Sequence, residues 1–202
     1  MILFFDTETT GFVNKGKPMD HPYQPHIVQL AAQLVTHDNE TVSEFSFIVD
    51  PGIIEVGKEK GVHIPSKVVD IHGIDDQKAL DLGVSWTTAI DLFMFNYEKA
   101  DLMVAHHIQF DKDLIEIART RRGHGDARLG VPGYCTMQNA RDVAKIPPTE
   151  RMVAAGRTHF KNPKLEECID VFFGEKLEGA HDAMNDVRAC RRVYFYLKGC
   201  GK

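Results

Sequence analysis

The sequence predicts an α/β fold with a mixed sheet flanked by helices, and three observations support this prediction. Residues 2–5 form an unbroken apolar run, which is typical of a strand buried on both faces. Two longer strand-like runs follow, separated by a turn of hairpin composition. In the second half of the chain, helical periodicity alternates with short apolar runs. This order indicates one domain whose sheet has about five strands, some parallel and some antiparallel.

The first half of the chain is expected to supply three antiparallel strands. Residues 27–36 and 41–49 are strand-like, and the tetrapeptide His-Asp-Asn-Glu between them suits a hairpin turn. Together with residues 2–5 they would form three neighbouring strands. The following residues, up to Gly83, are irregular apart from a short helix expected over 66–71.

The next segments alternate between helix and strand. Ser85 is the expected N-cap of a helix that reaches about residue 99. Residues 102–105 form a short buried strand, and a helix over 109–122 follows with apolar side chains along one face. Residues 131–135 are the expected last strand of the sheet.

The C-terminal part is expected to be helical, with one long connection. Thr136 is a candidate cap for the first helix, and residues 146–163 read as a loop. Asn162 as N-cap and Pro163 at the first helical position predict a helix to about residue 173. The final helix is expected over residues 182–197.

Composition limits the possible classes of protein. A chain of 202 residues suits a single domain with a well-buried core. No apolar run approaches the roughly 18 residues of a membrane span, and the acids Asp6 and Glu8 interrupt the N-terminal apolar stretch, so no membrane partner and no signal peptide are expected. Four scattered cysteines without C-x-x-C spacing point to a reducing cytoplasm rather than a disulfide framework; they are Cys135, Cys168, Cys190 and Cys200.

The charge is unevenly distributed. A net charge of −5 argues against a protein that grips long stretches of duplex. Ten cations nevertheless fall in one stretch whose only acids are Asp126, Asp142 and Glu150. If this stretch flanks an acidic site, it could hold a polyanion; the alternative is a solvated surface. The cations are Arg119, Arg121, Arg122, Arg128, Arg141, Lys145, Arg151, Arg157, Lys161 and Lys164.

Two carboxylates, Asp6 and Glu8, follow the first strand with the i, i+2 spacing that places both side chains on one face. Two neighbouring anions repel one another unless a cation joins them, and ligands that are all oxygen suit Mg²⁺ or Mn²⁺. The alternative is a polar turn in which Thr9, Thr10 and Gly11 are turn residues.

Two further segments place carboxylates beside structured elements. Asp111 lies in the first turn of the helix over 109–122, where an acid also stabilises the helix through its dipole. His181 precedes the last helix, and Asp186 lies just over one turn inside it. A loop histidine could swing over a site that Asp186 reaches from the helix, or both side chains could simply be exposed.

These segments together carry a resemblance. FDTETTG, AHHIQFD and HDAMND occur in the order and at the approximate separation typical of the DEDDh group of 3′–5′ exonucleases, the DnaQ-like and RNase T-like family. The resemblance spans almost the whole chain and includes an H-G-I element at His72. It implies an RNase H-like fold and a single exonuclease domain over residues 1–202. The chain departs from the family pattern at His107, where the family has Asn.

The resemblance also implies the chemistry. Asp6, Glu8, Asp111 and Asp186 match the four metal-binding acids, and His181 matches the general base. Two Mg²⁺ or Mn²⁺ ions about 3.5–4 Å apart would neutralise the phosphodiester and assist both the attacking and the leaving oxygen. In this family pattern Asp6 bridges the ions, Glu8 and Asp186 hold the ion on the nucleophile side, and Asp111 supports the other through water.

Substrate contacts are expected around the terminal nucleotide. The backbone near Thr9, Thr10 and Gly11 could receive the 3′-hydroxyl, and Phe12 could stack on the terminal bases or be a core residue. Four further positions match the family's nucleotide pocket, and His107 takes the place of the family's Asn beside them. The four are Val68, Ile71, His72 and Phe110.

The sequence therefore predicts a metal-dependent 3′–5′ exonuclease that releases 5′-mononucleotides from single-stranded 3′ ends, with DNA favoured. An exoribonuclease or oligoribonuclease is the nearest alternative. A haloacid-dehalogenase-like phosphatase and a non-catalytic nucleic-acid-binding module are remote ones. The protein partner could be a separate polymerase or a repair or replication protein, and the sequence leaves the oligomeric state open.

Overall fold

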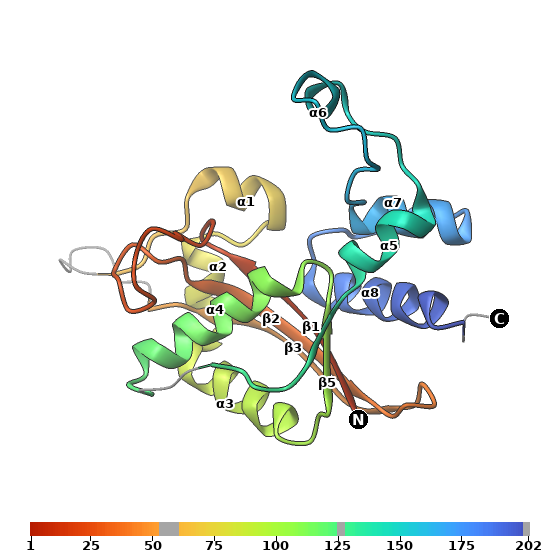
Figure 1. The fold of residues 1–202 in the computed structure, drawn as a ribbon. Coiled ribbons are helices and arrows are strands. Elements are labelled where there is room, and N and C mark those ends of the chain that lie inside the picture. The colour runs from red at the N-terminus through yellow and green to blue at the C-terminus, as the bar shows by residue number, and fades with distance from the viewer. Residues whose placement is uncertain (53–60, 125–127, 200–202) are drawn as a thin grey trace.

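The computed structural model describes residues 1–52, 61–124 and 128–199, and it shows a six-stranded sheet with helices on both faces (Figure 1). Asp126 and Cys200 lie outside the described residues. The strand order is β4-β3-β2-β1-β5-β6, so β1 is an interior strand. The strands are β1 (Ile2–Thr9), β2 (Ile27–Val35), β3 (Thr41–Asp50), β4 (Val84–Ser85), β5 (Leu102–Ala105) and β6 (Gly133–Cys135).

The sheet is mixed, as the sequence predicted. Strands β1, β2 and β3 are antiparallel neighbours, whereas β5 pairs with β1 in parallel and β6 pairs with β5 in parallel. The expected number of five strands is one too few. The additional strand, β4, pairs two residues in parallel with the end of β3, through Val49 with Val84 and Asp50 with Ser85. Two residues are too short a run to show any strand periodicity.

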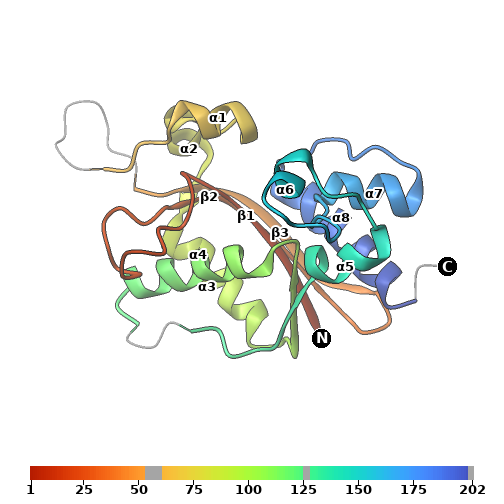
Figure 2. The same ribbon diagram turned by 45° about the horizontal axis from the view of Figure 1, so that its top comes forward.

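The described residues form eight helices, and some of these cover each face of the sheet (Figures 1 and 2). Helices α3 and α4 pack on one face and α8 on the other. The helices are α1 (Ser66–His72), α2 (Asp76–Leu82), α3 (Trp86–Tyr97), α4 (Ile108–Arg121), α5 (Thr136–Ala144), α6 (Glu150–Ala154), α7 (Leu165–Phe173) and α8 (Ala183–Leu197). No helix in the described part of the chain is both long enough and apolar enough to cross a membrane.

Strand β1 shows why the apolar run is buried on both faces. Leu3 and Phe5 belong to the hydrophobic cluster under α3 and α4, and Ile2 and Phe4 belong to the cluster under α8. All four side chains are at most 1% exposed. Because successive side chains alternate between faces, every later residue of β1 is assigned to one of these two helical layers.

The expected start of the helix before residue 173 is wrong, because of contacts made by Pro163 and Lys164. Helix α7 begins at Leu165 with Lys164 as its N-cap, two residues later than expected. The carbonyl of Pro163 accepts a hydrogen bond from Nε2 of His106 at 3.1 Å, and the carboxylate of Glu167 accepts the Lys164 N–H at 2.7 Å. The histidine contact holds Pro163 outside the helix, and the Glu167 contact starts the helix at Leu165.

Three other details also differ from the predictions. Thr136 does not cap α5; the N-cap position belongs to Cys135, and the buried Thr136 hydroxyl lies 2.9 Å from Nδ1 of His106. The irregular segment before Gly83 contains α2, which is capped by the Asp75 side chain. The expected loop over 146–163 contains the single-turn helix α6, which stands well away from the sheet (Figure 1).

Candidate functional site

The alternation of β1 aims its two carboxylates at the layer formed by α8. Asp6 and Glu8 continue the face of Ile2 and Phe4, so they lie where that hydrophobic layer ends. The parallel pairing of β1 with β5 stops at Phe4, and the two strands separate beyond it. The site therefore forms at the C-terminal end of β1, where polar groups of the strand are left without a β5 partner.

Asp111 reaches the same strand end from α4 on the other face. Its Oδ1 atom accepts the Thr7 backbone N–H at 3.1 Å and the Thr7 hydroxyl at 2.7 Å. Burial raises the pKa of Asp111 to about 7, although these two hydrogen bonds oppose the rise. Thr7 thus fixes the position of the carboxylate, and nothing in the sequence motif marks it for that role.

The start of α8 is fixed by Asp182 and Gln29. Asp182 caps the helix by accepting the backbone N–H groups of Met184 and Asn185, each at 3.2 Å. Gln29, the β2 partner of Glu8, donates to Asp182 at 3.0 Å and accepts the Ala183 N–H at 3.2 Å. This clamp sets the position of α8 relative to β1. A glutamine within an apolar strand could have suggested such a contact, but its partner was not predictable.

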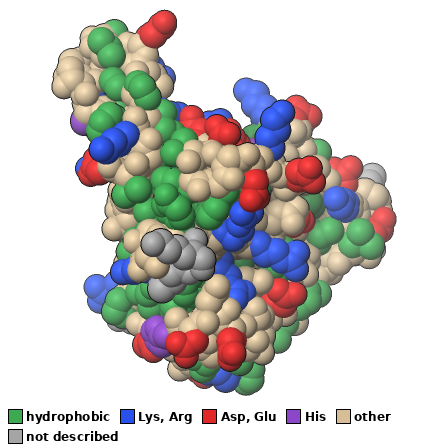
Figure 3. All heavy atoms as spheres, turned by 90° about the vertical axis from the view of Figure 1, so that its right-hand side faces the viewer, with side chains coloured by type: hydrophobic (Ala, Val, Ile, Leu, Met, Phe, Trp, Pro, Cys, Tyr) green, Lys and Arg blue, Asp and Glu red, His purple; other side chains and the backbone are tan. Residues whose placement is uncertain are grey.

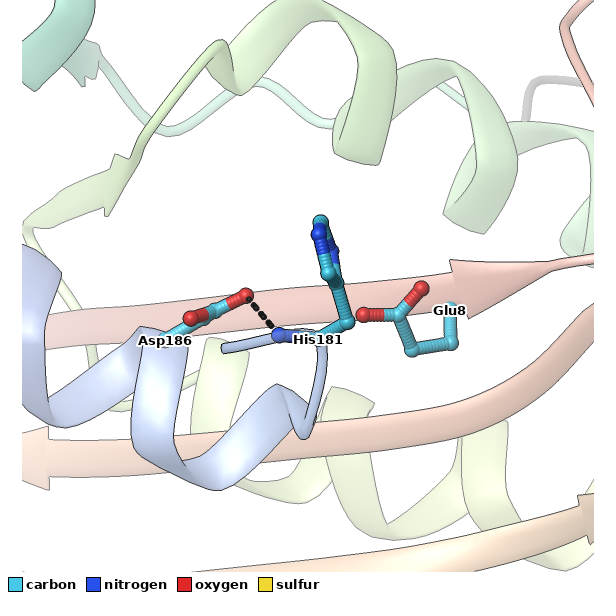
Figure 4. A group of neighbouring side chains, drawn as sticks. All are labelled: Glu8, His181 and Asp186. Carbon is cyan, nitrogen blue, oxygen red and sulfur yellow. Dashed lines mark hydrogen bonds between the residues drawn. The ribbon is translucent and has the colours of Figure 1, made fainter. Parts of the chain in front are cut away.

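These constraints bring Glu8, His181 and Asp186 together (Figure 4). One ligand atom from each lies within 4.8 Å of the other two. His181 adopts a positive φ of 68°, and its backbone N–H donates to Oδ2 of Asp186 at 3.3 Å. Figure 4 shows the imidazole ring standing between the two carboxylates. Asp6 lies close enough to Asp186, Glu8 and Asp111 for their charges to affect its ionisation.

The site has the electrostatics of a cation site. Burial, followed by repulsion from Asp111, Asp186 and Glu8, raises the pKa of Asp6 well above its usual value. Burial and the neighbouring Asp186 raise the pKa of Glu8 to about 8, and burial raises the pKa of Asp186 to about 6. Each carboxylate is therefore harder to ionise than usual, and a nearby positive charge would favour its ionised form.

One atom supports a metal ligand role directly. Oδ1 of Asp186 is buried and has no hydrogen-bond partner among the described residues. A buried oxygen without a partner is costly, because its hydration has been lost without replacement. A divalent ion that prefers oxygen ligands would satisfy this atom and neutralise the adjacent carboxylates. The donor set therefore fits Mg²⁺ or Mn²⁺.

A groove of about 520 Å³ opens beside these acids. Asp6, His181 and Asp186 line this groove together with Phe12 and His107. The rest of the lining comes from His106, Met137, Asn162, Pro163, Lys164, Leu165, Glu166, Leu177 and Ala180. Two of the candidate metal ligands, Asp6 and Asp186, thus face a space that is accessible from solvent.

Two rings that line the groove, Phe12 and His107, both contact the Phe110 ring, and the three together are called the aromatic rim below. The Phe12 ring is 91% exposed and meets Phe110 edge-on at a centroid distance of 6.3 Å. Exposure on this scale excludes the core alternative for Phe12. The His107 ring is nearly parallel to that of Phe110, with centroids 6.1 Å apart.

The backbone explains why His107 can stand where the family has Asn. His107 is the N-cap of α4 and has φ 83° and ψ 45°, in the left-handed region. Asn and His are both enriched among non-glycine residues in this region. The substitution therefore preserves the backbone conformation and adds a ring to the aromatic rim.

The expected nucleotide-contacting residues divide into two groups. His72 lies beside the site, since its Nδ1 accepts the Ile74 N–H and its Nε2 consequently donates to the Thr9 carbonyl at 3.3 Å. Thr9 and Gly11 form a turn through the Thr9 hydroxyl, and the Thr10 hydroxyl accepts the His26 N–H. These residues belong to the end of β1 and the turn after it.

The other two positions are on α1. Val68 packs against the small cluster formed by Val28, Ile64, Ile74 and Ala79, so it supports the helix. Ile71 is 53% exposed. Hydrogen bonding through His72 connects α1 to the site.

The sequence left open whether the basic stretch flanks the acidic site or forms a solvated surface, and the structure divides the stretch between the two. Arg121 donates to the backbone carbonyls of Gln24 and Pro25, and Arg122 pairs with Asp91, so both stabilise the far end of α4. Arg141 pairs with Asp142. Of the stretch, Lys164 lines the groove itself.

The model of the RNase_T exonuclease family matches residues 3–194. The chain belongs to this exonuclease family. The family match argues against the phosphatase alternative, and no curated protein sequence matches the chain.

Solved structures similar to this exonuclease chain include several of exonuclease I. One exonuclease I structure is 20% identical with a TM-score of 0.72, and the Escherichia coli complex with a dA16 oligonucleotide is 19% identical with a TM-score of 0.72. The zinc-bound complex of the E. coli enzyme with single-stranded DNA is 18% identical with a TM-score of 0.73. Each alignment covers 98% of this chain and 40% of that chain. The likeness at this identity concerns the fold, and the chain spans about two fifths of the length of these relatives.

Proposed function

We propose that this protein is a metal-dependent 3′–5′ exonuclease that hydrolyses phosphodiester bonds at the 3′ ends of single strands and releases 5′-mononucleotides. The supporting observation is convergence: acids from β1, α4 and α8 meet at one strand end, with a partnerless buried oxygen on Asp186. Membership of an exonuclease family supports the same reaction class. Residues 1–202 act as one exonuclease domain in this proposal.

Asp6, Glu8, Asp111 and Asp186 would hold two divalent ions, Mg²⁺ or Mn²⁺. Bound there, the ions supply positive charge to the phosphodiester and lower the pKa of the attacking water. The protein keeps the carboxylates in position before the ions arrive, through Thr7 on Asp111 and the His181 N–H on Asp186. Little reorganisation is then required when the substrate binds.

His181 is the general base in this mechanism. Its ring stands between Glu8 and Asp186 and lines the groove. A neutral imidazole can take the proton from water as the new P–O bond forms, and imidazole is the side chain best matched to neutral pH. The loop before α8 supports this position, since Asp182 and Gln29 fix the end of that loop.

The aromatic rim and the turn after β1 would hold the terminal nucleotides. Base stacking on exposed rings contributes about 1–3 kcal/mol per base in single-strand binding, and it tolerates any sequence. The exposed Phe12 ring is suited to that contact. Gly11, with φ 154° and no atom within 4 Å of where a Cβ would stand, leaves room for the sugar beside the backbone of Thr10.

DNA is the favoured substrate, because similar solved structures hold DNA oligonucleotides. The chain offers no clear reader of a 2′-hydroxyl. A reducing cytoplasm is the expected location, in agreement with free, buried thiols at Cys135, Cys168 and Cys190. A polymerase or a repair protein on a separate chain would present the 3′ end.

The test is digestion of matched DNA and RNA 12-mers carrying a label at either the 3′ or the 5′ end, with Mg²⁺, Mn²⁺ or EDTA. The proposal expects immediate release of 3′ label as mononucleotide, progressive shortening of 5′-labelled DNA, and no reaction in EDTA. Release of the 5′ label first, or full activity in EDTA, would overturn it. Faster digestion of RNA would instead assign an exoribonuclease.

A further inference from the structure

The segment between α5 and α7 forms an arm, residues 145–161, that the core does not account for. Lys161 N–H donates to the Ile146 carbonyl at 3.1 Å and closes the base of the arm. Within the arm, the Thr149 side chain caps the N-terminus of α6, and α6 has no buried side chain. The arm stands beside α5 and α7, across from α1, and projects from the body as a separate lobe (Figures 1, 2 and 3).

The arm is basic in an acidic protein. It carries four cations and a single acid, Glu150, whereas the whole chain has a net charge of −5. Lys145, Arg151 and Arg157 are exposed, and no acidic side chain in the described part of the chain pairs with them. The arginines of α8 differ, since Arg188 and Arg192 pair with Glu44 and Glu175, and Arg191 bonds to Asn39.

The arm is continuous with the catalytic groove. Asn162, Pro163 and Lys164, the residues directly after the arm, line the groove together with Asp6 and His181. The hydrogen bond from His106 to Pro163 ties this junction to the end of β5. Because burial lowers the pKa of His106 to about 4, the ring stays neutral and keeps the tautomer that this bond requires.

The arm also offers an exposed ring. Phe160 is 37% exposed next to the closed base of the arm. Exposed cations interleaved with an aromatic side chain are the two ingredients by which single strands are held without sequence preference. Duplex recognition would require a longer track of cations than this short arm provides.

We propose that the arm binds the backbone phosphates of a single strand upstream of its 3′ end, so that longer strands bind more tightly. The inference rests on the proposed function, because it places the 3′ end at the carboxylates. The terminal nucleotide occupies the side of Thr9, Phe12 and His72, and the preceding nucleotides cross the groove toward Arg151 and Arg157. The ligand is a single-stranded polynucleotide, and its phosphates rather than its sugars are recognised.

The salt dependence of binding tests the proposal. Affinities of 5′-fluorescein-labelled dT12 and dT4 would be measured in Mg²⁺ between 50 and 300 mM NaCl, about the range over which phosphate contacts weaken. The Asp186→Asn background prevents cleavage. Adding Arg151→Ala and Arg157→Ala should lower the slope of log Kd against log salt for dT12 by about 1.4, since each single-strand phosphate contact contributes about 0.7.

The matched control removes two cations away from the groove, through Lys99→Ala and Arg122→Ala. Lys99 bonds to the Phe95 carbonyl after α3 and Arg122 pairs with Asp91 at the end of α4, and Figure 1 shows both helices away from α6. The control should leave the slope unchanged. An equal fall in both variants, or no fall in the arm variant, would overturn the assignment. The same change with rU12 would show that phosphates are the ligand; a change confined to DNA would contradict this.

Cleavage by enzyme that keeps Asp186 distinguishes the arm proposal from the proposed exonuclease function. With the arm cations removed, the ratio of kcat/KM on dT12 to that on dT3 should fall on the order of tenfold, the effect of losing about two weak phosphate contacts. An unchanged ratio in an active enzyme would refute the arm proposal and leave the exonuclease proposal standing. If the wild-type enzyme cleaves no oligonucleotide, the exonuclease proposal is refuted. The salt dependence of Kd then decides whether the arm binds phosphates.

Discussion

The side chains of β1 alternate between the two faces of the sheet in both halves of the strand, but the two halves have different roles. Residues 2–5 place four apolar side chains in two hydrophobic layers, at most 1% exposed. In the second half, Asp6 and Glu8 continue one face of the strand, and Thr7, which bonds to Asp111, continues the other. The first half stabilises the sheet, whereas the second collects carboxylates whose pKa values are all raised. A strand anchored by the first half can hold repelling charges in the second.

The largest effect is expected from removing a carboxylate. Asp6→Ala or Asp186→Ala should lower kcat by on the order of 10³-fold or more, because metal ions contribute several kcal/mol to stabilising the charge of the transition state. The fold should survive, since neither change removes an apolar contact of residues 2–5. Circular dichroism and a cleavage assay would be run together. Either variant retaining the wild-type rate would show that the assigned site is wrong.

The next effect concerns His181. His181→Ala should reduce kcat about 10²–10⁴-fold, the usual contribution of a positioned general base. Mn²⁺ affinity should change far less, because the carboxylates remain. Loss of metal binding together with activity would instead make His181 a ligand, as its distance to Glu8 and Asp186 permits. Undiminished turnover at neutral pH would remove it from the mechanism.

The first half of the strand should respond in the opposite way. Leu3→Ala should lower the free energy of unfolding by about 2–5 kcal/mol, since the side chain is fully buried and leaves a cavity. The kcat of the folded fraction should be unchanged. If Leu3→Ala does not fold, Ile2→Val, at about 0.5–1.5 kcal/mol, provides the same comparison. A large loss of kcat with little loss of stability would contradict the division between the two halves.

The carboxylates that meet at the second half of β1 should make the stability of the metal-free protein depend on pH. Glu8, Asp111 and Asp186 have folded pKa values of about 8, 7 and 6, all above those of an unfolded chain. The folded state therefore binds more protons, and the free energy of unfolding falls as pH rises through this window. Added Mg²⁺ should raise Tm more at pH 8 than at pH 6. Scanning calorimetry in EDTA and in Mg²⁺ measures both; equal increments would count against the carboxylates as ligands.

The smallest effect is expected at the aromatic rim. Phe12→Ala should raise KM for a single strand by the equivalent of about 1–3 kcal/mol of lost stacking. Its Tm should stay the same, because the ring is 91% exposed and buries little. Phe12→Trp should restore binding. A fall in Tm without a change in KM would make the ring a structural contact with Phe110.

The sequence predicts the fold and the candidate site to different depths. Strong local signals sufficed for the core strands, for the Ser85 cap and for the helix beginning at Ala183. The start of α7 and the true role of Thr136 were not predictable, since both depend on His106. His106 lies 57 positions from Pro163, before the start of α7, and 30 positions from Thr136.

The candidate site shows the same limit. Short motifs predicted the candidate acids because each motif has a characteristic local order. Gln29, which positions α8, and Thr7, which positions Asp111, lie outside any charge pattern. Their roles arise from register: Gln29 stands opposite Glu8 across the β1–β2 pair. The arm cations were visible in the sequence, but only the fold separates them from the cations of α4 that bond to backbone.

Mn²⁺ binding, measured by titration calorimetry at pH 7.5, tests the central claim most directly. Wild-type protein should bind divalent ions at the end of β1, and the Asp6→Asn and Asp186→Asn variants should lose that binding while keeping the wild-type fold and gaining stability in EDTA. Leu3→Ala, folded at low temperature, should bind as the wild type does. Absence of Mn²⁺ binding to the wild type, or equal binding by all three variants, would contradict a metal site built on the second half of β1.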